Sequence, residues 1–201
     1  MTIKEFLEKL SSKEPTPGGG SVAAFAGALA ASLGCMVSNL TIGKKKYMDV
    51  EEEVKKVYSL LEEYKNKFLE EMEEDAKAFK KVIEALKLPK NTEEEKKIRE
   101  EKIQEATKEA TLTPLKIAQD ALEVMELTEI LIKKGYKMAL SDAAIAATMA
   151  KTAIISGIYN VKINLPLLKD QELVRELKRK IENMETEANF LELRIVSEFT
   201  L

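Results

Sequence analysis

Apolar residues recur every three or four positions along most of the chain, and no long stretch alternates between apolar and polar residues as a strand would. This spacing places the apolar side chains on one face of a helix after another. We therefore expect an all-α fold, a multi-helical bundle of long antiparallel helices. No fixed-period repeat and no low-complexity linker divides the chain, so the prediction is a single helical domain over residues 1–201.

Prolines, glycines and capping residues interrupt the pattern and predict six helices. Ser21 and Ser141 are expected to be N-caps, and Thr92 with Glu95 is typical of a capping box. Pro114 is expected to kink or divide the helix in which it lies. The six helices are predicted at about residues 3–10, 21–43, 49–88, 92–135, 141–160 and 170–199.

Two of the predicted helices are rich in small residues, which allow close approach of helix backbones. The second carries seven alanines and glycines between residues 23 and 31, and the fifth carries six alanines between residues 143 and 153. We expect this Ala/Gly-rich pair to pack centrally, against each other or across a subunit interface. Helices of nearly forty residues overshoot a small monomer, so we expect a homo-oligomer, most simply a homodimer.

Composition excludes several classes of chemistry. The chain has no histidine, a single cysteine (Cys35) and a net charge of −3. Histidine-dependent nucleophile pairs, histidine-containing metal sites and Cys-clustered zinc sites are therefore excluded, and we expect no metal and no cofactor. Because the net charge is slightly negative, the overall charge does not favour binding to nucleic acid. The uncharged stretch at residues 22–42 is better explained as a buried helix than as a membrane span, and without a visible targeting segment we expect a cytoplasmic protein.

One carboxylate lies among apolar residues of the third predicted helix. Asp75 follows Met72 by three positions and precedes Phe79 by four, so it falls within the arc of the apolar stripe. Burial disfavours the charged form of a carboxyl and raises its pKa, as a general acid requires. The alternative is a structural role, in which Asp75 pairs with a lysine or binds the end of a neighbouring helix.

Other residues suggest ligand binding, each with a plainer structural alternative. A glycine-rich segment opens the second helix, where free backbone amides suit an anion or a planar ligand but also suit a tight helix crossing. A lysine cluster could bind carboxylates or be a solvated loop. Asp142 and two asparagines could hydrogen-bond a heterocycle or serve as caps and turn residues. These candidates are Pro17, Gly18, Gly19, Gly20, Ser21, Lys44, Lys45, Lys46, Asp142, Asn160 and Asn164. We expect Cys35 to be a packing residue.

Taken together, these segments resemble one known family. The match is carried by residues 15–21 (PTPGGGS) with the following Ala-rich helix into residues 44–47, and by residues 75–79 (DAKAF), 88–90, 92–94, 141–142 and 160–165 (NVKINL). The sequence is similar to the cyclodeaminase domain of formiminotransferase-cyclodeaminase and to stand-alone methenyltetrahydrofolate cyclohydrolases. The glycine-rich segment is the most specific of these motifs.

The resemblance implies an all-helical dimer that acts on a folate carrying a one-carbon unit. It makes Asp75 the proton donor, and it places the glycine-rich segment and the asparagine motif in the folate pocket. From charge, we expect the lysine cluster to meet the glutamate tail of a folate that could be polyglutamylated. The first expectation is formimidoyltetrahydrofolate cyclodeaminase, with methenyltetrahydrofolate cyclohydrolase as the alternative. A non-catalytic helical scaffold and a metal-binding bundle are rival interpretations, the latter disfavoured by the lack of histidine.

Overall fold

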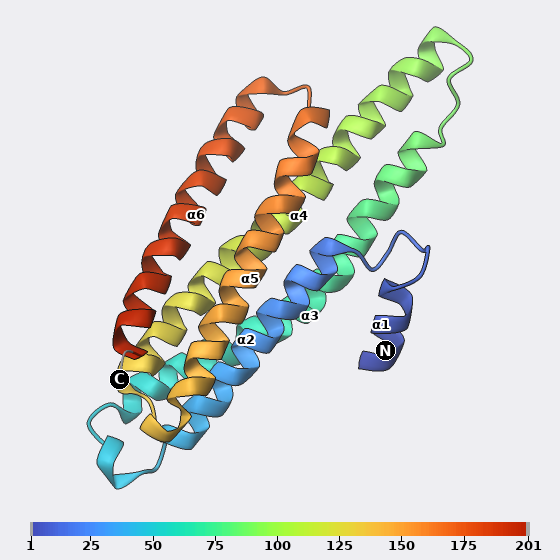
Figure 1. Cartoon of the computed structure of the whole chain (residues 1–201). Coiled ribbons are helices and arrows are strands. Elements are labelled where there is room, and N and C mark those ends of the chain that lie inside the picture. Colours follow the sequence, from blue (N-terminus) through green and yellow to red (C-terminus); the bar gives the residue numbers. More distant parts are fainter. Residues whose placement is uncertain (1, 200–201) are drawn as a thin grey trace.

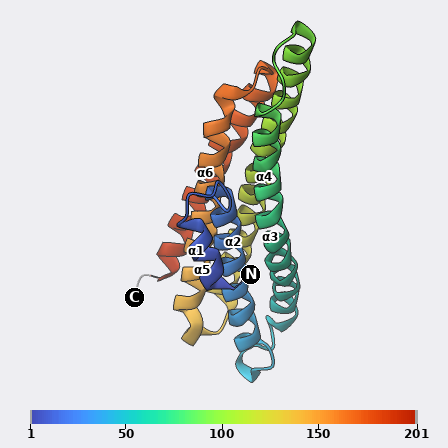
Figure 2. The ribbon, with the colours of Figure 1, turned by 90° about the vertical axis from the view of Figure 1, so that its right-hand side faces the viewer.

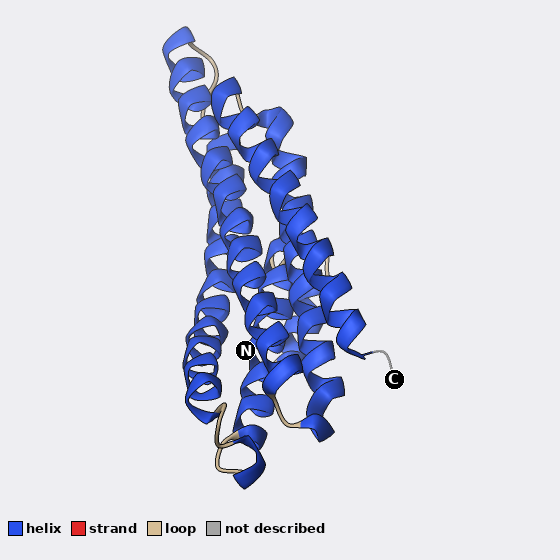
Figure 3. Cartoon of the chain, turned by 90° about the vertical axis from the view of Figure 1, so that its left-hand side faces the viewer, coloured by secondary structure: helices blue, strands red, loops and turns tan. Residues whose placement is uncertain are grey.

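The computed structural model describes residues 2–199, and within them every regular element is a helix (Figures 1 and 3). The all-α prediction is therefore confirmed, although the predicted domain 1–201 includes three residues outside the described part. The α-helices are α1 (Ile3–Leu10), α2 (Gly19–Thr41), α3 (Glu51–Leu86), α4 (Glu93–Lys134), α5 (Leu140–Asn164) and α6 (Gln171–Phe199). Short 3₁₀ turns η1 (Lys45–Tyr47), η2 (Lys137–Ala139) and η3 (Leu165–Leu167) lie between them.

Helices α2 to α6 run alternately up and down, so that each is antiparallel to the next (Figure 1). Helices α2, α3, α4 and α5 pack in a ring, and α6 covers the groove between α4 and α5. At one end, α3 and α4 continue beyond the other helices as a projecting pair (Figure 2). Helix α1 lies at the side of the bundle, where Phe6 packs on Phe25 with ring centroids 5.4 Å apart.

The predicted helix ends agree with the structure where a side chain caps the helix. The capping box of Thr92 with Glu95 is present, since the Thr92 hydroxyl accepts from the Glu95 N–H and the Glu95 carboxylate accepts from the Thr92 N–H. The predicted caps Ser21 and Ser141 are wrong. The N-cap of α2 is Gly18, three residues before Ser21, and the N-cap of α5 is Ala139, so that α5 begins at Leu140. In both cases the cap has no side-chain hydrogen bond, so no capping side chain marks the start in the sequence.

Pro114 neither divides nor ends α4, which continues from Glu93 to Lys134. A proline removes the N–H that would bind the carbonyl four residues earlier, here that of Ala110. The Asn164 side chain supplies the missing donor, with its Nδ2 atom 3.0 Å from the Ala110 oxygen. The backbone of α5 also approaches this part of α4, because a Cβ on Gly157 would lie 2.7 Å from the Pro114 oxygen. Tertiary contacts thus accommodate the proline that the sequence marked as a break.

Three glycines set the contact between α2 and α3. Gly20, Gly27 and Gly34 are seven residues apart on α2, and each faces a residue of α3 at the same spacing. A Cβ on Gly34 would lie 2.6 Å from the Leu61 side chain, and one on Gly27 would lie 2.7 Å from the Phe68 ring. Leu61 and Phe68 are fully buried. The two antiparallel helices therefore meet along a seven-residue repeat in which glycine accommodates the larger partner.

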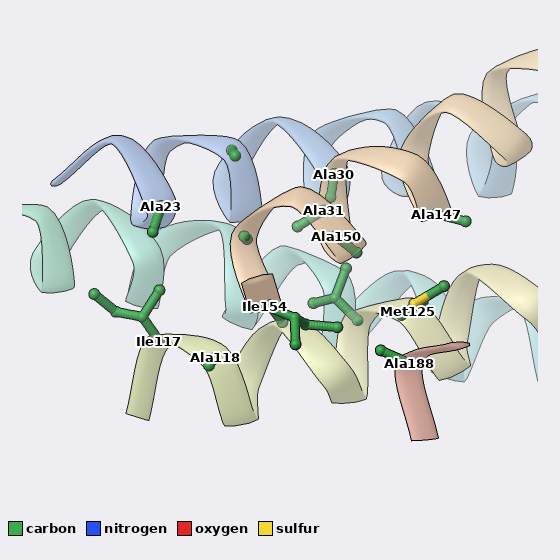
Figure 4. Close-up of a cluster of buried hydrophobic side chains, with 14 of the residues drawn as sticks. Ala23, Ala30, Ala31, Ile117, Ala118, Met125, Ala147, Ala150, Ile154 and Ala188 are labelled. Carbon is green, nitrogen blue, oxygen red and sulfur yellow. The ribbon is translucent and has the colours of Figure 1, made fainter. Parts of the chain in front are cut away.

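Small side chains fill much of the remaining core. Alanines of α2 and α5 lie beside Ile117, Met125 and Ile154 (Figure 4). Within the described part of the chain, two stretches are long and apolar enough to cross a membrane by composition alone, α2 and residues 137–167. Two-thirds of the apolar window of α2 is buried within the protein, against α3, α4 and α5. Packing of α2 inside the bundle accounts for its hydrophobic sequence.

Gly27→Ala is expected to destabilise the protein although alanine is the better helix former. The added methyl would lie 2.7 Å from the fully buried Phe68 ring, and such overpacking costs about 1–3 kcal/mol. Urea unfolding measures the difference in the free energy of unfolding. Ser32→Ala, an exposed change on the same helix, is the control. A Gly27→Ala protein as stable as that control would contradict the close approach.

A candidate acid–base site at the start of helix α2

The start of α2 is the point at which predicted site residues from three helices meet. A Cβ on Gly20 would lie 1.9 Å from Oδ1 of Asp75 on α3, so the carboxyl occupies the space beside this glycine. A Cβ on Gly19 would lie 3.2 Å from Nδ2 of Asn160 on α5. The chain enters α2 through a cis Thr16–Pro17 peptide bond and the Gly18 cap. The glycine-rich segment, Asp75 and Asn160 thus form one site.

Ser21 provides the hydrogen bonds of the Asp75 carboxyl. Its hydroxyl lies 3.1 Å from Oδ2 of Asp75 and also 3.3 Å from the carbonyl oxygen of Met72. Burial raises the pKa of Asp75 above its ordinary value, while the hydroxyl and backbone N–H of Ser21 act to lower it, and burial is the larger effect. The side chain stays partly accessible to solvent. A partly accessible carboxyl with a raised pKa is suited to exchange protons with a bound molecule.

Asp75 also binds the end of a neighbouring helix, which is the structural role considered above as the alternative to acid–base chemistry. The first backbone N–H groups of a helix have no partner within it, and they carry a partial positive charge that favours an anion. Here the N–H of Ser21 interacts with the carboxyl. The same hydrogen bonds that fix the start of α2 therefore orient the carboxyl, and the two interpretations share one geometry.

The apolar stripe predicted around Asp75 is partly wrong. Phe79, expected beside Asp75 in the core, is 40% exposed, and Leu86 is 46% exposed. The buried face of α3 follows a seven-residue repeat instead and consists of Val54, Val57, Leu61, Phe68, Glu71, Ala78 and Ala85. Asp75 extends the series of Leu61 and Phe68. An ideal helix drifts by about 20° per seven residues, enough over 36 residues to turn Phe79 outward.

Glu71 is the residue that sequence reasoning missed. It belongs to the buried face of α3, yet it lies within a run of acidic residues whose other members are solvent-exposed or half-exposed. A seven-residue reading of the α3 pattern would have found it, because it lies seven residues before the buried Ala78.

The two predicted asparagines have different roles. Asn160 lies against Gly19, and its Nδ2 donates to the Ser156 carbonyl at 2.8 Å within α5. This leaves its amide group beside the start of α2. Asn164 lies one turn further along α5, where its amide binds the Ala110 carbonyl that Pro114 leaves free. Asn160 therefore belongs to the candidate site, whereas the observed contact of Asn164 is structural. Helix α5 continues to Asn164, beyond its predicted end near residue 160.

The lysine cluster and Asp142 lie at the opposite end of the bundle from Asp75. Helix α2 has 23 residues and so separates Gly19 from the lysines by about 34 Å. Lys44 Nζ lies 4.3 Å from the centre of the Tyr136 ring, while Lys45 and Lys46 are exposed. Asp142 is in the first turn of α5, which is antiparallel to α2 (Figure 1). In one chain these residues cannot share a pocket with Asp75.

Cys35 is buried in α2, and burial raises the pKa of its thiol to about 12. A thiol in this state is a poor nucleophile at neutral pH. Among the described residues there is no group of three or more carboxylates and thiols arranged to hold a metal ion. The prediction that no metal or cofactor takes part stays a prediction.

Ser21→Ala is expected to raise the pKa of Asp75 further. The substitution removes the hydroxyl that stabilises the ionised carboxyl and leaves its burial unchanged. A pH titration of the Asp75 carboxyl carbon by NMR measures the shift. Ser32→Ala, whose hydroxyl binds the Ala28 carbonyl within α2, is the control. An unchanged or lowered pKa in Ser21→Ala would show that the hydroxyl does not stabilise the ionised carboxyl.

Known proteins resemble this chain over most of its length. A methenyltetrahydrofolate cyclohydrolase from Methylorubrum extorquens is 43% identical over 96% of this chain and 93% of its own. A mouse formimidoyltransferase-cyclodeaminase is 30% identical over 93% of this chain, which spans only 35% of that longer protein. The crystal structure of a formiminotetrahydrofolate cyclodeaminase from Thermotoga maritima superposes with a TM-score of 0.89 at 30% identity and covers 98% of this chain and 95% of its own. The family profile described as formiminotransferase-cyclodeaminase matches residues 2–183, and the chain belongs to this family.

Proposed function

We propose that this protein is a folate one-carbon enzyme in which Asp75 moves protons at the carbon carried between N5 and N10 of tetrahydrofolate. The observation that supports this most directly is the half-buried Asp75 carboxyl, which has a raised pKa and lies against Gly20 beside Asn160. The glycines let Asp75 and Asn160 approach the backbone at the start of α2, and the Asn160 amide offers a donor and an acceptor to a heterocycle. These features suit the pterin portion of a folate.

In cyclodeamination, the N10 nitrogen of formimino-tetrahydrofolate attacks the amidinium carbon and forms a tetrahedral intermediate. The Asp75 carboxylate accepts the proton from N10 and then delivers it to the amino group, which leaves as ammonia. The bond from N10 to carbon forms first, the bond from carbon to the amino nitrogen breaks in the second step, and the carboxyl returns to its starting state. A general acid–base group of this kind contributes about 10²- to 10⁴-fold to the rate.

In cyclohydrolysis, water adds to the same carbon of methenyl-tetrahydrofolate. The Asp75 carboxylate accepts a proton from the water and then protonates the ring nitrogen that leaves when the carbon–nitrogen bond breaks. Both reactions pass through a tetrahedral carbon that carries two folate nitrogens. One carboxyl in one pocket can therefore serve either reaction.

The relatives favour different members of this pair of reactions. The bacterial relative at 43% identity, which is matched over nearly its whole length, is named a cyclohydrolase. The structural neighbour, also matched over nearly its whole length, is a cyclodeaminase. Cyclodeamination is the first expectation from the sequence, and the higher identity to the cyclohydrolase favours hydrolysis as the second candidate.

We further propose that the active protein is a cytoplasmic homodimer. Apolar residues remain exposed on α1, α2 and α5, which include Ile3, Leu7, Leu29, Met36, Tyr159 and Ile163. In such a dimer a lysine cluster (Lys44, Lys45, Lys46) could meet the glutamate tail of a folate bound at the Asp75 site of the second copy. Within one chain, the distance of about 34 Å along α2 rules out the same role for a short tail.

Asp75→Asn is expected to lower kcat about 10²- to 10⁴-fold while folate binding survives, because the amide keeps the shape of the side chain but cannot carry the proton. The near-ultraviolet absorbance of the methenyl form measures both reactions. Its decay reports hydrolysis, and its appearance from formimino-tetrahydrofolate with ammonia release reports cyclodeamination. Glu73→Gln, an exposed change on the same helix, is the control. Turnover of Asp75→Asn close to that of the wild type would exclude the assigned role, and absence of both reactions in the wild type would favour the scaffold.

Sedimentation equilibrium at micromolar concentration is expected to give about twice the chain mass of 22.6 kDa. The physical reason is the exposed apolar surface, which a second copy would remove from water. Tyr159→Lys, a change at a side chain that is 63% exposed, should shift the equilibrium toward monomer if α5 lies in the interface. A single species at the monomer mass for the wild type would contradict the dimer.

A further inference from the structure

Two carboxyl groups are buried together between α3 and α4, one helical turn from Asp75. The Glu71 side chain is 1% exposed and the Asp120 side chain 11% exposed. Both carboxyl oxygens of Glu71 and Oδ2 of Asp120 are buried without a hydrogen-bond partner. Unpaired polar atoms of this kind are costly, and buried charges more so. Three such oxygens in one place require a physical explanation.

The surrounding cations account for only part of this cluster. Lys67 Nζ lies 2.7 Å from Oδ1 of Asp120 and neutralises that carboxylate. Lys116 Nζ lies 3.3 Å from Oε1 of Glu71, without the geometry of a hydrogen bond, and it also lies 3.5 Å from the exposed Glu74. Oδ2 of Asp120 and Oε2 of Glu71 are thus left without a donor, and the two carboxyl groups interact with each other.

Among the described residues, the charged groups that act on Glu71 are Asp120 and Lys116, both on α4. Helix α2 packs against both α3 and α4 but contains no charged residue. On α5, which packs against α4, Lys151 pairs with Glu192 and Lys162 pairs with Glu185, both on α6. The protonation of the two carboxyls is therefore decided within the α3–α4 contact, by Lys67, Lys116 and the carboxyls themselves.

We propose that Glu71 and Asp120 share one proton, and that Glu71, held neutral in this way, is a positioning residue for Asp75. A proton on Glu71 lets its O–H donate to Asp120, which satisfies an orphaned oxygen on each side. Burial and the neighbouring Asp120 carboxylate raise the pKa of Glu71 to about 8, in agreement with this arrangement. The shared proton also joins α3 to α4 next to the turn that carries Asp75.

Neutral Glu71 matters for the chemistry because residues four apart on a helix lie on the same side, with Cβ atoms about 5–6 Å apart. An ionised Glu71 would oppose ionisation of Asp75 and raise its pKa further. The acid–base cycle needs Asp75 in both states near neutral pH. This inference rests on the proposed function for its catalytic consequence, but the shared proton itself is independent of the substrate.

The experiment compares the wild type with Glu71→Gln and Asp120→Asn, and uses Glu74→Gln as the matched control because Glu74 contacts the same lysine from an exposed position. For each protein, thermal unfolding is followed from about pH 6 to about pH 9.5 without substrate. A native Glu71 with a pKa near 8 keeps a proton that the unfolded chain loses near its ordinary value of 4.5. Over the measured range, the contribution of Glu71 to wild-type stability should therefore fall as pH rises from about 6 to about 8 and stay constant above it.

The glutamine variant should lose this pH-dependent fall, because its amide is neutral throughout, whereas Glu74→Gln should keep it. At neutral pH, kcat of Glu71→Gln should stay within about twofold of the wild-type value. A plot of kcat against pH falls on its acidic side, where Asp75 becomes protonated. In Asp120→Asn, Glu71 is free to ionise against Lys116, so this acidic limb should move to higher pH. Movement of that limb in one variant and not in the other is not expected of a purely structural pair.

Two results would overturn the proposal. If Glu71→Gln and Glu74→Gln behave alike in both pH series, Glu71 does not hold the proton. If folded Glu71→Gln loses activity at every pH as Asp75→Asn does, Glu71 acts in the chemistry rather than by positioning. If the wild type turns over neither folate, the proposed function fails, and the unfolding series alone still supports or excludes the shared proton.

Discussion

The contact between Gly20 and Asp75 is the constraint on which the candidate site depends. The carboxyl occupies the space where any other residue at position 20 would place its Cβ atom. The same close approach brings Ser21 within hydrogen-bond distance of the carboxyl and shields it from water. Burial raises the pKa of Asp75 while Ser21 limits the rise, so that one interhelical contact sets both the position of the acid and its readiness to exchange a proton.

The antiparallel topology explains why the candidate residues separate into two groups. The start of α2 meets the end of α5, so Gly19 and Asn160 lie together, whereas Lys44 and Asp142 lie at the far end. Residues that suggest ligand binding in the sequence therefore cannot all line one pocket of a single chain. Only a second copy, as in the proposed dimer, would bring the lysines near the Asp75 site.

The packing of α3 shows how a small error in helical period changes the chemistry inferred. At 3.6 residues per turn, the stripe continues from Met72 through Asp75 to Phe79, which turns out to be exposed. The seven-residue repeat imposed by the glycines of α2 places Glu71 and Ala78 in the core instead. Glu71 then contacts Asp120 across the α3–α4 interface. A buried pair of carboxyl groups therefore lies one helical turn from Asp75.

The sequence by itself determined the all-helical class, the position of most breaks, the capping box at Thr92 and the unusual setting of Asp75, because these follow from local spacing and residue type. It could not determine that α4 continues through Pro114, since the donor that rescues the Ala110 carbonyl comes from Asn164, 54 residues away. The same holds for the pairing of Glu71 with Asp120 and for the separation of the lysines from Asp75. Those features depend on which helix faces pack against one another and in which register, and only tertiary packing decides that.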